Sequence, residues 1–126
     1  MIQPRSIVQI ADNSGAKVGR IFKVLGSAAK RYARIGEVVV LSVQVAEPRK
    51  SVKKKDVLRA VVVRQKQPFR RKDGSYIRFD ENAVVILETS GKDKKEPKAG
   101  RIFGPIPREL QDLGYQTIIS RAPEVV

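Results

Sequence analysis

Short apolar segments separated by turn-forming residues recur along the chain. The clearest covers residues 37–46, where Val39, Leu41, Val43 and Val45 alternate with other side chains and predict a strand with one buried face. Similar runs predict strands at residues 7–10, 18–25, 56–64, 82–87 and 116–120. About six short strands at this spacing favour a small antiparallel barrel or sandwich. We expect a barrel, because closure removes exposed strand edges.

Turn and breaker residues add detail to this mainly β pattern. Asp73-Gly74 predicts a β-hairpin between residues 65–72 and 76–79. Pro107 can begin a short helix that ends at Leu113 with Gly114 behind it, so that Leu110 and Leu113 share a face. The charged residues 91–100 predict an exposed loop. No repeat or linker divides the chain, so we expect one domain over residues 1–126.

Composition excludes several kinds of chemistry. Apolar residues make up 41% of the chain and are mostly Ile, Val and Leu, which indicates a small aliphatic core. The sequence has no Cys and no His. Disulfides, thiolate nucleophiles, His- or Cys-based zinc sites and a Ser-His-Asp triad are therefore excluded. No apolar run approaches about 18 residues, and the start does not resemble a signal peptide. We therefore expect no membrane partner, and a cytoplasmic or organellar location.

The distribution of charge along the chain is the strongest indication of a binding partner. The net charge is +13, and residues 49–72 hold eleven Lys or Arg against a single acid, Asp56. Residues 73–126 are close to neutral, with eight bases and nine acids. Like charges crowded together do not stabilise a domain, so an external polyanion such as an RNA backbone is the expected partner. The neutral part is expected to face a different partner.

The candidate RNA-binding residues fall into three groups. We expect the first two to bracket one strand and to project from one side of the barrel, the alternative being a solvated basic face. In the third group, Tyr32 either stacks on a base or packs in the core. The groups are Arg49, Lys50, Lys53, Lys54 and Lys55 on a loop; Arg64, Lys66, Arg70, Arg71 and Lys72 on the next strand and hairpin; and Lys30, Arg31, Tyr32 and Arg34.

Residues 101–110 are the candidate contact with protein or another subunit. Arg101, Ile102 and Phe103 precede a rigid Gly-Pro break, and Arg and aromatic anchors on a stiff support are typical of protein contacts. Arg108 and Glu109 belong to the same candidate patch. The alternative is that Ile102 and Phe103 only cap the barrel.

Other chemistries leave weaker signals. Residues 12–15 predict a tight turn, since they lack the oxygen ligands of a calcium loop and the pattern of a P-loop. An RNA hydrolase with a carboxylate-held metal would need Asp12, Asp56, Asp73 and Asp80 to converge. A free single-strand-binding barrel would need more exposed aromatic side chains than Tyr32, Phe69 and Tyr76. We therefore expect no catalytic residue, metal or cofactor.

Six motifs in order resemble a known family over nearly the whole chain: ADNSGA at 11–16, KRYA at 30–33, KKKDVLRAVVVR at 53–64, DGS with IRFD at 73–80, RIFGP with REL at 101–110, and IIS with APEV at 118–125. Together they resemble ribosomal protein fourteen of the large subunit, in its bacterial or organellar form. The resemblance implies a closed five-stranded β-barrel with an extra β-hairpin and short C-terminal helices.

The same resemblance implies a structural, non-enzymatic role in the ribosome. Members bind large-subunit rRNA, contribute to intersubunit bridges with small-subunit rRNA, and pack beside large-subunit proteins three and nineteen. In bacteria and organelles the family also docks a ribosome silencing factor. Arg101 matches the family there, whereas Gly100 and Thr117 stand where Thr and Lys are common.

Overall fold

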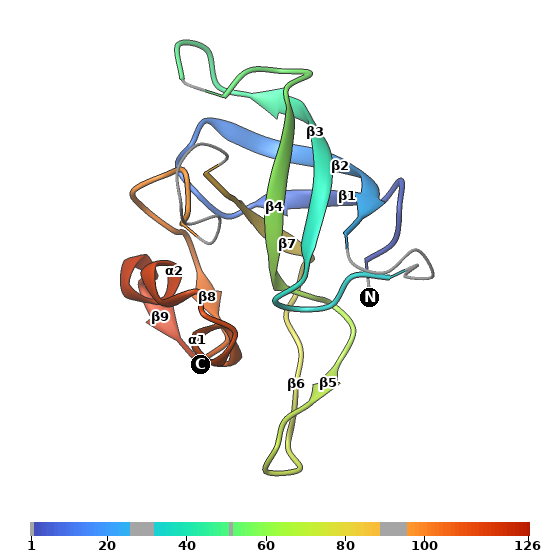
Figure 1. Cartoon of the computed structure of the whole chain (residues 1–126), viewed down its shortest axis with the longest axis vertical. Helices are drawn as coiled ribbons and strands as arrows, with labels where there is room; N and C mark the ends of the chain where they lie inside the picture. The colour runs from blue at the N-terminus through green and yellow to red at the C-terminus, as the bar shows by residue number, and fades with distance from the viewer. Residues whose placement is uncertain (1, 26–31, 51, 89–95) are drawn as a thin grey trace.

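A computed structural model describes residues 2–25, 32–50, 52–88 and 96–126. The elements in chain order are β1 Ile7–Ile10, β2 Ala16–Val24, β3 Val38–Ala46, β4 Val57–Arg64, β5 Phe69–Arg70, β6 Tyr76–Ile77, β7 Ala83–Ile86, β8 Pro105–Ile106, α1 Glu109–Asp112, α2 Gln116–Arg121 and β9 Glu124–Val125. Figure 1 shows the barrel with the β5–β6 hairpin extending from one end and the C-terminal elements beside it. No helix within the described ranges is long and apolar enough to cross a membrane.

Five strands form a closed barrel in the order β1-β2-β3-β4-β7. Four of the pairings are antiparallel, and the barrel closes through a parallel pairing in which Gln9 of β1 lies opposite Ala83 of β7. The expected five-stranded barrel with an extra hairpin is therefore confirmed.

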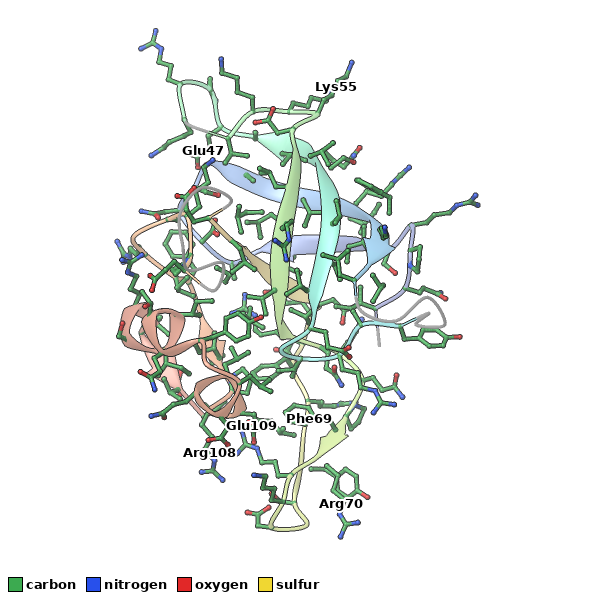
Figure 2. The ribbon with its side chains drawn as sticks, in the orientation of Figure 1. Glu47, Lys55, Phe69, Arg70, Arg108 and Glu109 are labelled. Atoms are coloured by element: carbon green, nitrogen blue, oxygen red, sulfur yellow. The ribbon has the colours of Figure 1, made fainter. Side chains whose placement is uncertain are left out.

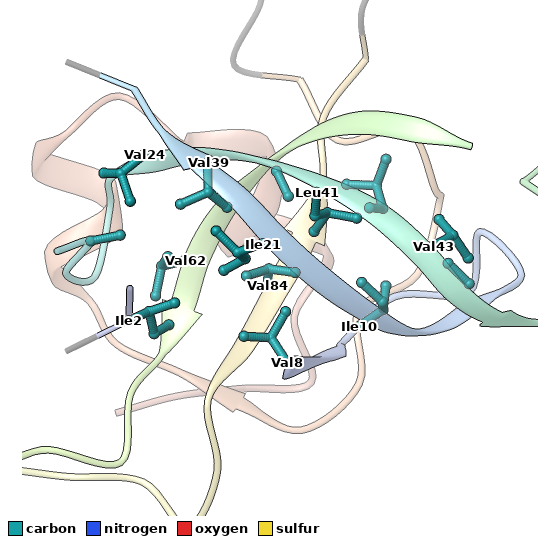
Figure 3. Packing of buried hydrophobic residues seen from close by; sticks show 14 of the residues in the cluster. Ile2, Val8, Ile10, Ile21, Val24, Val39, Leu41, Val43, Val62 and Val84 are labelled. Carbon is teal, nitrogen blue, oxygen red and sulfur yellow. The ribbon is translucent and has the colours of Figure 1, made fainter. Parts of the chain in front are cut away.

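The alternation along β3 fills the barrel interior. Val39, Leu41 and Val43 are fully buried, as the sequence pattern predicts, and they meet Ile21 and other side chains from neighbouring strands (Figure 3). Val52, from the β3–β4 loop, also has no exposed surface and belongs to the same cluster. The loop is therefore anchored to the core.

Strand β7 and residues 60–64 of β4 are buried on both faces. Ala60 and Val62 of β4 point into the barrel, whereas Val61 and Val63 belong to a second apolar cluster outside it. The C-terminal part of the chain completes this second cluster with Ile102, Ile106, Leu110, Tyr115 and Ile118. The near-neutral end of the sequence thus folds against one wall of the barrel.

Two predictions about the C-terminal part are wrong. Residues 116–120 form helix α2 rather than a strand, because Tyr115 and Ile118 lie about one helical turn apart and both enter the second cluster. Residues 96–100 are not a wholly exposed loop, since Pro97 and Ala99 are buried. Residues 91–95 lie outside the described ranges.

The predicted short helix is confirmed as α1. Its C-cap is Leu113, and Gly114 follows with φ 95°. This is the left-handed conformation that glycine favours behind a helix. Leu110 is fully buried, whereas Leu113 remains 45% exposed.

Two aspartates make the same local turn in opposite surroundings. In one, Asp12 Oδ1 accepts hydrogen bonds from Ser14 Oγ at 2.6 Å and Ser14 N at 3.1 Å. In the other, Asp73 Oδ1 accepts from Ser75 Oγ at 2.6 Å and Ser75 N at 3.0 Å. Asp12 is buried, and its Oδ2 also accepts from Ile86 N at 2.9 Å, whereas Asp73 is exposed.

Burial and hydrogen bonding therefore shift the pKa values of these two carboxyl groups in opposite directions. Burial raises the pKa of Asp12 above 3.8, against the lowering effect of Ser14. The Ser75 hydroxyl lowers the pKa of Asp73 below 3.8. Because the pKa of Asp12 is higher in the folded state than in the unfolded state, its contribution to stability is fully present below the pKa of the unfolded state. This contribution is lost as the pH rises through the pKa of the folded state.

We predict that carbon-13 NMR titration of the folded protein places the Asp12 pKa above 3.8 and the Asp73 pKa below it. Replacing Ser75 by Ala should return the Asp73 pKa part of the way toward 3.8, because it removes the hydroxyl hydrogen bond that lowers this pKa most and keeps the one from the Ser75 backbone N–H. The Ser14→Ala variant is the matched control and should raise the Asp12 pKa further. Identical pKa values at the two sites would contradict the burial argument.

Arg64, at the end of β4, is an internal residue. It is 6% exposed, and its Nη1 donates to the carbonyls of Phe103 at 2.9 Å and Pro105 at 3.2 Å. Its Nη2 contacts Glu81 Oε1 at 3.1 Å. Gly104 lies between the two carbonyls with φ 77°, and a Cβ there would lie 2.1 Å from Arg64 Nη1.

We predict that Gly104→Ala lowers the free energy of unfolding by about 2–4 kcal/mol, combining left-handed strain with displacement of a buried, hydrogen-bonded charge. Urea unfolding measures the effect. Gly100→Ala is the matched control and should change stability by less than about 0.5 kcal/mol, because a Cβ at that position meets nothing within 4 Å. Equal effects at the two glycines would exclude this account.

Candidate nucleic-acid interface

The β3–β4 loop presents one group of cations at one end of the barrel. All five predicted side chains are exposed: Arg49, Lys50, Lys53, Lys54 and Lys55. The acid Asp56 shapes this loop, because its Oδ2 accepts a hydrogen bond from Lys53 N at 2.9 Å. With Val52 buried beneath it, the loop is a supported basic surface that we call the basic loop.

Backbone geometry fixes two of these cations. Arg49 has φ 67° and Lys55 has φ 74°, conformations that residues other than glycine seldom adopt. The Lys55 amide donates to Val43 O at 2.8 Å, which ties that turn to β3. Strained residues of this kind cluster at functional sites when their surroundings hold them.

The basic loop also packs on the turn at residues 12–15. Gly15 has φ 109°, and a Cβ there would lie 2.3 Å from Lys50 Cβ. The backbone of Glu47 donates to Gly15 O at 2.7 Å, and its carboxylate lies 3.7 Å from Lys17 Nζ. The tight turn predicted for these residues thus supports the basic loop, and Gly15 permits the close approach.

The β5–β6 hairpin presents a second group of cations. Lys66, Arg70 and Lys72 are exposed, and so is Arg78 beyond β6. We call these four residues, together with strands β5 and β6, the basic hairpin. Arg71 differs, since its Nη2 donates to Val126 O at 2.7 Å and its Nε lies 2.8 Å from Glu109 Oε1.

The two basic surfaces lie at opposite ends of the molecule. In Figure 2 the basic loop near Lys55 and the hairpin near Arg70 mark the two ends of the long axis. Strand β4 connects them, and its eight residues at roughly 3.3 Å each span about 26 Å. The expectation that both groups project from one side of the barrel is therefore corrected.

Besides Arg71, three predicted site residues have internal roles. Arg64 is buried and bonded to the chain around Gly104, so the structure removes it from the RNA-facing surface. Ile102 is 1% exposed and packs in the second cluster, where it cannot meet a partner. Glu109 is half-buried and paired with Arg71.

The third candidate group is described in part. Lys30 and Arg31 lie outside the described residues. Tyr32 is 46% exposed and Arg34 is exposed, so both side chains are accessible to a partner. Arg34 also lines a cavity beside that hairpin, together with Phe69 and Arg70.

Arg101 and Phe103 remain accessible in the candidate contact patch. Arg108 is also exposed, but it lies toward the basic hairpin rather than beside them, and its charge contributes to the lowered pKa of Asp73. The Arg101 guanidinium lies 5.5 Å from the centre of the Phe103 ring, within the range of a cation–π contact. Both side chains line a groove of about 500 Å³ that also reaches Lys17 and Lys50. The patch is therefore continuous with the basic loop, a connection that the sequence did not indicate.

Isolated cations were missed by sequence reasoning. Lys17 and Arg78 stand outside the dense run, and only the fold brings them to the basic surfaces. The signal that finds them is positional: Lys17 lies on the strand that pairs with the end of β3, and Arg78 follows the return strand of the predicted hairpin.

The acids proposed for a metal-dependent hydrolase lie in different places. Asp12 is buried at the end of β1, Asp56 caps a turn of the basic loop, and Asp73 lies at the hairpin tip. In the described part of the chain, no three acidic side chains form a group that could hold a metal ion. The described surface offers cations for phosphate contacts, with Arg for planar bidentate bonding and Lys as mobile charge.

Comparison with known families identifies the family of the chain. A family model described as ribosomal protein L14p/L23e matches residues 1–126, the full length of the chain. Such families are typically non-enzymatic and reside in the ribosome, among rRNA and other ribosomal proteins. The chain therefore belongs to the ribosomal protein L14p/L23e family and is a structural protein of the large ribosomal subunit.

Proposed function

We propose that this protein binds large-subunit rRNA directly, with the basic loop and the basic hairpin contacting separate RNA segments. The observation that carries the proposal is the placement of exposed cations at both ends of β4, each group supported by backbone bonds or buried side chains. The two surfaces lie about 26 Å apart, and the major groove of an A-form RNA helix is deep and narrow, so one groove does not accommodate both surfaces.

The contacts are expected to position the protein and to neutralise phosphate, with RNA shape supplying selectivity. Of the predicted cations, Arg34, Arg49, Lys50, Lys53, Lys54, Lys55, Lys66, Arg70 and Lys72 carry this role, and Lys17 and Arg78 join them. Lys30 and Arg31 remain candidates from the sequence. Arg71 acts indirectly, because its bonds to Glu109 and Val126 hold the hairpin against the C-terminal elements.

We further propose that Arg101 and Phe103 face protein or small-subunit rRNA at an intersubunit bridge, and that Arg108 takes part in such a contact separately, from the end of the molecule that carries the basic hairpin. The exposed Phe103 ring beneath the Arg101 guanidinium supports a contact surface that differs from a plain phosphate site. Large-subunit proteins three and nineteen are the proposed neighbours, and a ribosome silencing factor is a proposed ligand of the same patch.

We predict that affinity for large-subunit rRNA falls by about 10³–10⁵ between 50 and 200 mM salt, if roughly 6–10 phosphates are contacted. Joint replacement of Lys53, Lys54 and Lys55 by Ala should reduce the slope of log affinity against log salt by about one for each phosphate that is no longer neutralised. Filter binding over a salt series measures both quantities. Lys23→Ala, an exposed cation on β2, is the control, and a salt-independent affinity would refute the proposal.

We predict that Arg101→Ala weakens subunit joining, or capture of a protein partner, while rRNA affinity changes less than about twofold. The reason is that the guanidinium lies over the Phe103 ring and is not one of the basic-loop cations, although the groove that it lines also reaches Lys50. Arg101→Lys keeps the charge without the planar stack and should fall between wild type and the Ala variant. Sucrose-gradient analysis of subunit joining gives the readout, and a parallel loss of rRNA binding would argue against separate surfaces.

A further inference from the structure

A cavity lies between the first strand of the basic hairpin and the rest of the protein. Its volume is about 560 Å³, within the roughly 300–1,000 Å³ that small-ligand pockets span. Its apolar wall is made by Ile35, Pro68 and Phe69, of which Ile35 and Phe69 are half-buried. Figure 2 shows Phe69 near the base of the hairpin, close to Glu109, with Arg70 extending outward.

Contacts from separate segments hold this cavity open. The buried Gln65 accepts a hydrogen bond from Ile35 N at 3.2 Å and donates to Gln67 O at 2.9 Å. On the other side, Arg71 bonds to Val126 O and to Glu109. The walls are therefore fixed by bonds between segments distant in sequence, so a ligand would meet a largely formed site.

Charge at the cavity favours an anion. Among the described lining residues Glu109 is the single acid, and it is paired with Arg71 at 2.8 Å. Arg34, Arg70 and Lys72 also line the cavity, and all three are exposed. Cations around an aromatic and aliphatic wall match the two halves of a nucleotide, whose phosphate is anionic and whose base presents an apolar face.

The neighbouring cavities differ in this respect. The cavity on the side of β6 is lined by Asp80, Glu81 and Glu124, acids that oppose a phosphate chain. The groove beside the basic loop is lined by two acids, Asp12 and Glu47, of which Glu47 lies 3.7 Å from Lys17. Only the cavity beside β5, of these three, combines an aromatic wall with a single, already paired acid.

We propose that this cavity captures one unstacked RNA nucleotide, with its base against Phe69 and its flanking phosphates on Arg34, Arg70 and Lys72. The inference rests on the proposed rRNA binding and adds a base-stacking site to it. Both amide atoms of Gln65 are engaged within the protein, so stacking rather than reading of the base edge holds the nucleotide. The site is therefore expected to tolerate different bases.

The test compares two aromatic residues on adjacent hairpin strands. Phe69→Leu keeps an apolar side chain but removes the ring, and it should weaken binding to transcribed large-subunit rRNA by about 5- to 100-fold. The salt slope should stay unchanged, because no phosphate contact is removed. Tyr76→Leu is the matched control on the same hairpin, since Tyr76 is 70% exposed and does not line the cavity, and it should weaken rRNA binding several-fold less than Phe69→Leu does.

A conservative variant and a direct probe complete the experiment. Phe69→Trp should restore most of the affinity, and chemical probing should reveal one nucleotide protected by wild type and by Phe69→Trp but exposed with Phe69→Leu. Thermal melting verifies that each variant is folded. If wild type binds rRNA with the expected salt slope while Phe69→Leu matches Tyr76→Leu, the nucleotide site is wrong and the proposed function stands.

Two further outcomes would also overturn the nucleotide site. If wild type does not bind rRNA, the proposed function fails and this inference fails with it. If Phe69→Leu leaves rRNA affinity intact but releases a large-subunit protein from the assembled particle, the cavity takes an acidic peptide instead.

Discussion

The burial of residues 60–64 of β4 on both faces is the constraint on which the other features depend. One face supplies Ala60 and Val62 to the barrel interior, and the other supplies Val61 and Val63 to the cluster beneath the C-terminal helices. The register of residues 60–64 is fixed, because a slip by one residue would exchange Ala60 and the larger Val61 between two close-packed clusters and would displace Arg64 from its carbonyl partners. The segments that leave the two ends of β4 are therefore fixed in position, and these segments carry the basic loop and the basic hairpin.

Arg64 completes that constraint at the end of β4. A buried guanidinium is tolerated only when it is paired and hydrogen-bonded, and here two carbonyls and Glu81 meet that requirement. The carbonyls belong to the segment around Gly104, so the same contact joins the barrel to the C-terminal elements. Arg71 repeats the arrangement farther along the chain, where it joins the hairpin to Val126. Two arginines within a basic run thus serve the fold.

Local pattern was sufficient to predict the barrel strands and the hairpin. Val39, Leu41 and Val43 alternate, and Asp73-Gly74 supplies a turn signal that needs no distant partner. Helix α2 was missed because Ile118 and Ile119 suggest a strand locally, whereas the second cluster selects the helical spacing of Tyr115 and Ile118.

The candidate site was predictable as a set of cations but not in its arrangement. Arg64 is separated from its carbonyl partners by 39 and 41 residues, so its burial depends on contacts that no local pattern contains. The position of Phe103 beside Lys50 has the same origin, since the fold alone brings residues 101–103 to the turn at 12–15.

The geometry also explains how one domain tolerates so dense a run of charge. Residues 49–72 carry eleven bases and one acid, yet the structure places two of these bases on β4 and the others at its two ends. Charges separated by about 26 Å lie roughly three Debye lengths apart at physiological ionic strength, where the screening length is about 8 Å. Repulsion between the two ends is therefore largely screened, and each end has only its own few cations to accommodate. An RNA that contacts both ends is attracted by each surface separately. A run that looks like a single excess of charge in sequence is therefore, in physical terms, two moderate basic surfaces on a stiff apolar spacer.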